Sequence, residues 1–119
     1  MNMQEFYDRI VEDVAEPMLN FMQECGDDAE FSANDVENCK TILKNYVDKL
    51  ATLSEPTDDE IMAQVKIAVL AHNELNEATD YSMIETSERE SICILIQDVA
   101  EACGLQAEID DVTEEWRDF

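Results

Sequence analysis

The sequence predicts an all-α protein, a compact bundle of four main helices followed by a short C-terminal helix. The chain has 119 residues, enough for a single domain over 1–119 that buries about two-thirds of its unfolded surface. Apolar residues make up 45% of it, too many for a disordered chain, and it contains only two Gly and two Pro. Apolar side chains also recur at three- and four-residue intervals along most of its length.

The first helix is expected over about residues 3–24. Pro17 lacks the N–H that a helix interior needs, so we expect a kink or a split near residues 13–17. Gly26 is placed to end the helix in a left-handed conformation. The apolar face of this helix is predicted to hold Phe6, Ile10, Val14, Met18 and Phe21.

The second helix has the clearest apolar seam of the chain, from Val36 to Leu53. Asn34 and Glu37 have the spacing of a capping box at its start. The segment Ser54-Glu55-Pro56 is expected to end it, because the residue before a proline disfavours helical backbone.

The third helix, about 58–77, begins at a capping box of Thr57 and Glu60. Apolar residues surround it instead of forming one stripe, since Ile67 and Leu70 lie opposite its main apolar face. The helix is therefore either the centre of the bundle or has a second partner. That partner would be another chain in contact with Ile67 and Leu70.

The fourth helix is expected over about 88–103, with Ser87 and Glu90 as its capping box and Gly104 as its stop. Asp111 and Glu114 have the spacing to begin a short last helix. The four cysteines contain no C-x-x-C pair, and we interpret all of them as reduced thiols.

Charge is the strongest feature of the composition. Thirty Asp and Glu against seven Lys and Arg give a net charge of −23. Such a chain repels nucleic acid and anionic membranes and attracts basic surfaces. No signal peptide is recognisable, and the apolar runs are too short to span a bilayer. We therefore expect a cytoplasmic protein with neither a nucleic-acid nor a membrane partner.

Motifs of enzyme or metal chemistry are missing, so we expect no catalytic residue, no cofactor and no metal site. The segment 28–39 imitates a calcium loop but has Ala33 in place of the turn glycine and Cys39 in place of the bidentate Glu. The single histidine, His72, projects onto the apolar face of the third helix. We interpret it as a buried neutral imidazole bonded to Asn76 or to a backbone carbonyl, with a pH switch or ligand site as the alternative.

Seven residues are candidates for contact with a partner protein. The acids of the first helix recur on one side of it and form a negative row. Ile94 is an apolar residue on the polar side of the fourth helix. The two aromatic residues near the C-terminus either pack on the bundle, which we favour, or anchor a partner. The complete set is Glu5, Asp8, Glu12, Glu16, Ile94, Trp116 and Phe119.

The last third of the chain resembles small, uncharacterised, acidic all-helical proteins of bacteria. The resemblance rests on Ile84-Glu85-Thr86, Arg89-Glu90, Gly104-Leu105 and a C-terminal D-x-T-x-x-W-R-x-aromatic pattern over 111–119. Leu75-Asn76-Glu77 is counted with it. The resemblance implies a bacterial origin and attaches no activity, cofactor or site residue.

The leading hypothesis is a non-enzymatic interaction protein that binds a basic protein partner, in the manner of an immunity protein or inhibitor. One alternative is a homo-oligomeric protein whose charge serves only solvation. Another is a DNA mimic that inhibits a nucleic-acid-binding protein. Carboxylates about 5–6 Å apart on a helix can imitate the closely spaced charges of a duplex.

Overall fold

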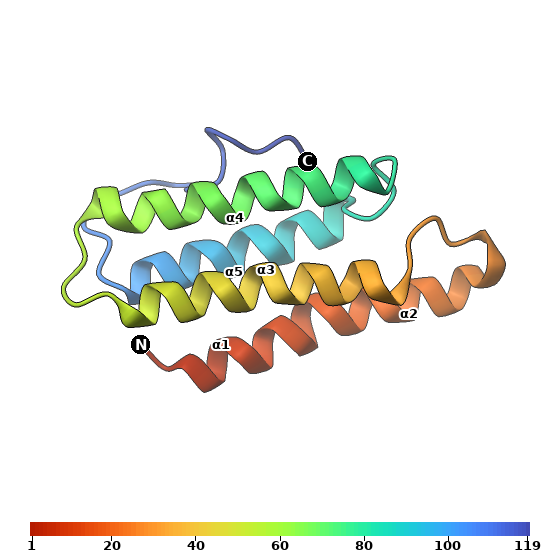
Figure 1. Cartoon of the computed structure of the whole chain (residues 1–119), viewed down its shortest axis with the longest axis horizontal. Helices are drawn as coiled ribbons and strands as arrows, with labels where there is room; N and C mark the ends of the chain where they lie inside the picture. Colours follow the sequence, from red (N-terminus) through yellow and green to blue (C-terminus); the bar gives the residue numbers. More distant parts are fainter.

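In the computed structural model, which describes residues 1–119, the chain is all-helical and contains no strand. The predicted fold class is confirmed. The helices run antiparallel to one another along the chain, and the C-terminal segment returns across the bundle (Figure 1). The elements are α1 (Met3–Arg9), the π-helix η1 (Ile10–Ala15), α2 (Glu16–Cys25), the 3-10 turn η2 (Gly26–Asp28), α3 (Ala33–Thr52), α4 (Asp58–Ala78) and α5 (Thr86–Ala102).

One apolar core joins all the α-helices. It contains 25 buried residues, and its largest fully buried side chains include Met18, Leu43, Ile61 and Ile92. The hydroxyl of Tyr46 on α3 donates to the carbonyl of Ile96 on α5 at 2.8 Å, which satisfies a polar group inside this core.

The first helix is divided just before Pro17, in agreement with the sequence. The N–H of Glu16 donates to the carbonyl of Val11, five residues back, which is the bond of a π-helix. Pro17 could not donate to the carbonyl of Asp13, and its ring would crowd that oxygen in a regular α-helix. The widened turn of η1 lets the helix continue past the proline.

The π-helix changes which residues face the core. Buried positions recur every four residues at Phe6, Ile10, Val14 and Met18, instead of every 3.6. The prediction that Phe21 lies on this apolar face is wrong, because its side chain is 39% exposed. The half-buried residue that packs against the core is the next one along, Met22.

Two of the predicted helix starts need correction. The cap of α3 is Ser32, whose side chain accepts from the N–H of Asp35 in a complete capping box, and Asn34 lies inside the first turn. The helix α5 begins at Thr86 after Glu85, without a side-chain cap, so Ser87 is not a cap. The box of Thr57 and Glu60 at α4 is confirmed.

Both glycines are at helix ends with positive φ, +58° at Gly26 and +100° at Gly104, as predicted. After Gly104 the chain crosses α4 and α5 in extended and turn conformations. The carboxylate of Asp58 accepts two backbone N–H groups there, from Gln106 at 2.8 Å and Ala107 at 3.0 Å. In place of a regular last helix, residues 112–116 form turns, and the N–H of Thr113 donates to the side chain of Asp111.

Candidate protein-interaction site

The predicted acidic row lies on the outer side of the first helix, and all four of its residues are exposed. Asp8, Glu12 and Glu16 each follow a buried core residue by two positions. They therefore stay opposite the core through the π-helix. Glu5 lies in the first turn of α1, just beside this line. We call Asp8, Glu12 and Glu16, with Glu5 beside them, the acidic row.

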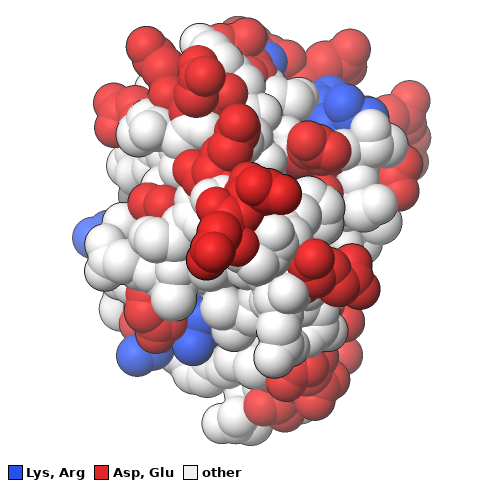
Figure 2. Space-filling view, turned by 90° about the vertical axis from the view of Figure 1, so that its right-hand side faces the viewer, with Lys and Arg blue, Asp and Glu red and all other residues white.

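No residue of the acidic row forms an ion pair. The ion pairs of the molecule involve only four of the thirty carboxylates, those of Asp13, Glu37, Asp98 and Asp111, and none belongs to the row. Acidic side chains also outnumber basic ones at the end of the bundle where α2 leads to α3 and α4 leads to α5 (Figure 2). Most of the negative charge is therefore available to an incoming cationic surface.

Ile94 is 56% exposed and lines a groove of about 300 Å³ between α5 and the C-terminal segment. Asp98 in the same groove pairs with Arg9 of α1 at 2.9 Å, so Ile94 and the acidic row lie on neighbouring helices. The groove is lined by charges of both signs, from Arg89, Glu90, Asp98, Asp110, Asp111 and Arg117.

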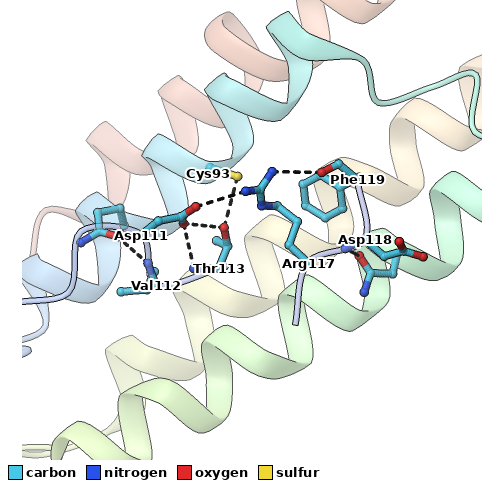
Figure 3. Close-up of polar contacts among 9 residues, drawn as sticks. Cys93, Asp111, Val112, Thr113, Arg117, Asp118 and Phe119 are labelled. Atoms are coloured by element: carbon cyan, nitrogen blue, oxygen red, sulfur yellow. Dashed lines mark hydrogen bonds and ion pairs between the residues drawn. The ribbon is translucent and has the colours of Figure 1, made fainter. Parts of the chain in front are cut away.

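Arg117 and Asp111 hold the C-terminal segment together beside this groove (Figure 3). Nη2 of Arg117 is 3.3 Å from Oδ2 of Asp111, and Nη1 donates to the carbonyl of Phe119 at 3.0 Å. The hydroxyl of Thr113 donates to Oδ1 of Asp111 at 2.6 Å and lies 3.4 Å from Sγ of Cys93. Arg117 is thus bonded within its own segment, and its Nε is buried without a hydrogen-bond partner. This cluster supports the segment and leaves little of Arg117 free for a ligand.

The two C-terminal aromatic residues are half-buried and pack against the core. Asn73 of α4 anchors this part of the chain: its Nδ2 donates to the carbonyl of Trp116 and its Oδ1 accepts from the N–H of Asp118, both at 2.8 Å. The ring of Phe119 lies 6.1 Å from that of His72. The structure therefore does not bring Trp116 and Phe119 together with the acidic row.

His72 is fully buried in the core, and its Nδ1 is 2.8 Å from the carbonyl of Ala68. A carbonyl oxygen only accepts, so Nδ1 carries the proton, and Nε2 accepts from the thiol of Cys39, whose sulfur is 3.5 Å away. Burial lowers the pKa of His72 to about 4. The predicted neutral imidazole with a backbone partner is confirmed, while Asn76 instead accepts from the N–H of Ile84.

The cysteines are all free thiols, as predicted. Burial raises the pKa of Cys39 to about 12, so this thiol stays protonated. No group of three or more His, Cys, Asp and Glu side chains is placed to hold a metal ion. None of the helices combines the length and the hydrophobicity of a membrane-spanning segment.

Sequence reasoning missed two apolar residues beside the acidic row. Val11 and Leu19 are exposed, and each follows a buried core residue by one position. The signal was present as an apolar residue directly after a core position, at Val11 and again two turns later at Leu19. Periodicity alone assigns such residues to the edge of the core, whereas here no neighbouring helix covers them.

Residues 15–119 match a protein family described as Family of unknown function (DUF5713). No curated protein and no solved structure matches the chain.

Proposed function

The chain belongs to the family DUF5713, whose function is unknown, and from its surface we propose that it is a non-enzymatic interaction protein that binds a basic protein partner. The acidic row is the binding surface in this proposal. Binding would neutralise or inhibit the partner wherever the contacted basic surface is the one that the partner uses.

One observation carries the proposal: the acidic row is exposed, continuous through the π-helix, and without a cation of its own. Asp8 accepts a hydrogen bond at 2.9 Å from the uncharged amide of Gln4, and this contact leaves the negative charge in place. Carboxylates already paired within the molecule would have to exchange one cation for another. Those of the row only lose water when they bind.

The apolar neighbours of the row support a protein partner. Val11 and Leu19 offer contact area that excludes water, as the apolar centre of a protein interface does. The net charge of −23 would accelerate the approach of a cationic surface over about a Debye length, roughly 8 Å at physiological ionic strength.

The test is association kinetics with the partner recovered by affinity capture from the native host. The triple variant Asp8→Asn, Glu12→Gln, Glu16→Gln removes the row and spares Glu5, which lies in the first turn of α1. We expect the on-rate at low salt to fall on the order of tenfold and its salt dependence to flatten, since steering charges act mainly on association.

A matched control removes three charges elsewhere: Glu108→Gln, Glu114→Gln, Glu115→Gln, all exposed in the C-terminal segment. Both variants change the net charge by the same amount. If the two variants lower the on-rate equally, the effect belongs to net charge and the acidic row is not the binding surface. If neither variant changes the on-rate, the acidic side chains serve only solvation and the proposal is wrong.

Duplex DNA distinguishes the mimic hypothesis within the same experiment. A partner that binds nucleic acid and releases this protein when duplex DNA is added would use one groove for both ligands. Simultaneous binding of DNA and this protein would exclude DNA mimicry and leave the basic-surface proposal unchanged.

A further inference from the structure

A second surface differs in chemistry from the rest of the molecule. A groove of about 340 Å³ runs between α3 and α4, which pack against each other. Ile67 in this groove is 61% exposed, the largest exposure of any large apolar side chain in the protein, and Leu70 beside it is also exposed. We call this surface the α3–α4 face; its lining includes Ile42, Asn45, Lys49, Gln64, Ile67 and Ala71.

Carboxylates are absent from the centre of the α3–α4 face. Residues 61–73 contain no Asp or Glu, and residues 38–53 contain only Asp48, in a chain with thirty acids. Asp48 is not among the groove residues, and its carboxylate accepts a hydrogen bond from the hydroxyl of Tyr7 on α1. Among the groove residues the only charge is that of Lys49.

We propose that the α3–α4 face binds a second copy of this chain and forms a twofold dimer. Two molecules that each carry −23 repel one another over most of their surfaces, and the repulsion is smallest where no carboxylate lies in the contact. A basic protein or a cation would instead be drawn to the acids elsewhere. The occupant that gains from an apolar, carboxylate-free face is one that is itself acidic, and a second copy is acidic by composition.

The side chains of the face suit a self-complementary contact. Ile42, Ile67 and Leu70 provide apolar area, and Ala71 lets a partner helix approach closely. Asn45 and Gln64 can hydrogen-bond across a twofold axis, because an amide both donates and accepts. Dimerisation would also cover the second apolar side of α4.

This inference is independent of the proposed function. The acidic row faces outward from α1, η1 and α2, whereas the α3–α4 face belongs to α3 and α4. A dimer would leave both acidic rows open to partners. Failure of either proposal leaves the other intact.

The test is sedimentation velocity of the full chain from micromolar to near-millimolar concentration, at low and at physiological salt. We expect a monomer–dimer equilibrium whose dimer fraction rises with salt, because screening reduces repulsion while the apolar contact persists. A chain that stays monomeric under all these conditions overturns the proposal. An association that weakens with salt also overturns it, since it would join carboxylates to lysines.

Two isoleucine variants locate the contact. Ile67→Glu puts a carboxylate in the centre of the face and should weaken dimerisation on the order of tenfold or more. Ile94→Glu makes the same change at a similarly exposed isoleucine of α5, 56% against 61%, and should leave the dimer intact. Circular dichroism checks that both variants remain helical. Equal weakening by the two variants, or none by Ile67→Glu, would show that the α3–α4 face is not the interface.

Discussion

His72 in the core binds a proton less readily in the folded protein than in the unfolded chain, and this difference makes stability depend on pH. Its pKa is about 4 in the folded protein and about 6.5 in an unfolded chain, because burial disfavours the charged imidazole. Between these values the unfolded chain binds a proton that the folded protein does not. Stability from the neutral ring is therefore complete above about pH 6.5 and is lost as the pH falls toward 4.

The variant His72→Gln isolates this effect. Loss of the ring should cost roughly 1–3 kcal/mol near neutral pH, since the carbonyl of Ala68 and the thiol of Cys39 lose their partner. The stability difference between wild type and variant should shrink by about 2 kcal/mol between about pH 7 and about pH 5. Urea unfolding of both proteins at the two pH values measures it.

Comparison of the two proteins removes the background of the other acids, which titrate in both. If the free energies of unfolding of wild type and variant change with pH in parallel, His72 takes up no extra proton on unfolding. Partner binding should be nearly unchanged in the variant, because no atom of His72 reaches the surface. A stable variant that loses its partner would place a functional site at this residue.

At the scale of the element, the first helix shows how one proline changes the face of a helix. The core of this helix repeats every four residues, and the π-helix before Pro17 supplies the wider turn that this repeat needs. The same repeat keeps Asp8, Glu12 and Glu16 in line. A regular helix would rotate each successive acid of this spacing by about 40°.

The beginning of α3 allows a direct test of helix capping. Ser32→Ala should destabilise the protein by about 1 kcal/mol, because the side-chain acceptor for the N–H of Asp35 is lost. Asn34→Ala, two residues along and exposed, is the control and should cost little or even stabilise, since alanine is the better helix former. Thermal or urea unfolding gives both values. A larger cost at Asn34 than at Ser32 would contradict the observed cap.

At the scale of the whole molecule, the negative charge destabilises the fold by self-repulsion and also forms the proposed binding surface. Twenty-six of the thirty carboxylates have no cation within ion-pair distance. They share a body with a radius of gyration of 14.2 Å, so many like charges lie within one or two Debye lengths of each other. This self-repulsion weakens the compact state.

Sodium chloride should therefore raise the melting temperature between low and physiological ionic strength. Chloride is preferable to sulfate for this measurement, because sulfate strengthens apolar burial in its own right. Differential scanning calorimetry at several salt concentrations follows the shift. A melting temperature that stays constant or falls would show that repulsion among the carboxylates contributes little to stability.

Much of this protein follows from patterns that span only a few residues. The number and order of the main helices, the two glycine stops and the cap at Thr57 come from periodicity and local hydrogen bonding. The acidic row and the neutral His72 follow from the same patterns, because the face of a helix is set by spacing along it. The cap of α3 lies at Ser32, two residues before the predicted Asn34. Both side chains can accept a hydrogen bond from the backbone, and only the backbone conformation selects between them.

Whether an apolar residue outside the main core face is covered depends on residues that are distant in the sequence, and only the tertiary structure decided it. Periodicity assigned Phe21 to the core, but the π-helix turns this position outward. The apolar residues all around α4 allowed either a central helix or a second partner. The packed bundle covers one side of α4 and leaves Ile67 exposed, because whether an apolar side chain meets protein or water depends on which other elements lie against it.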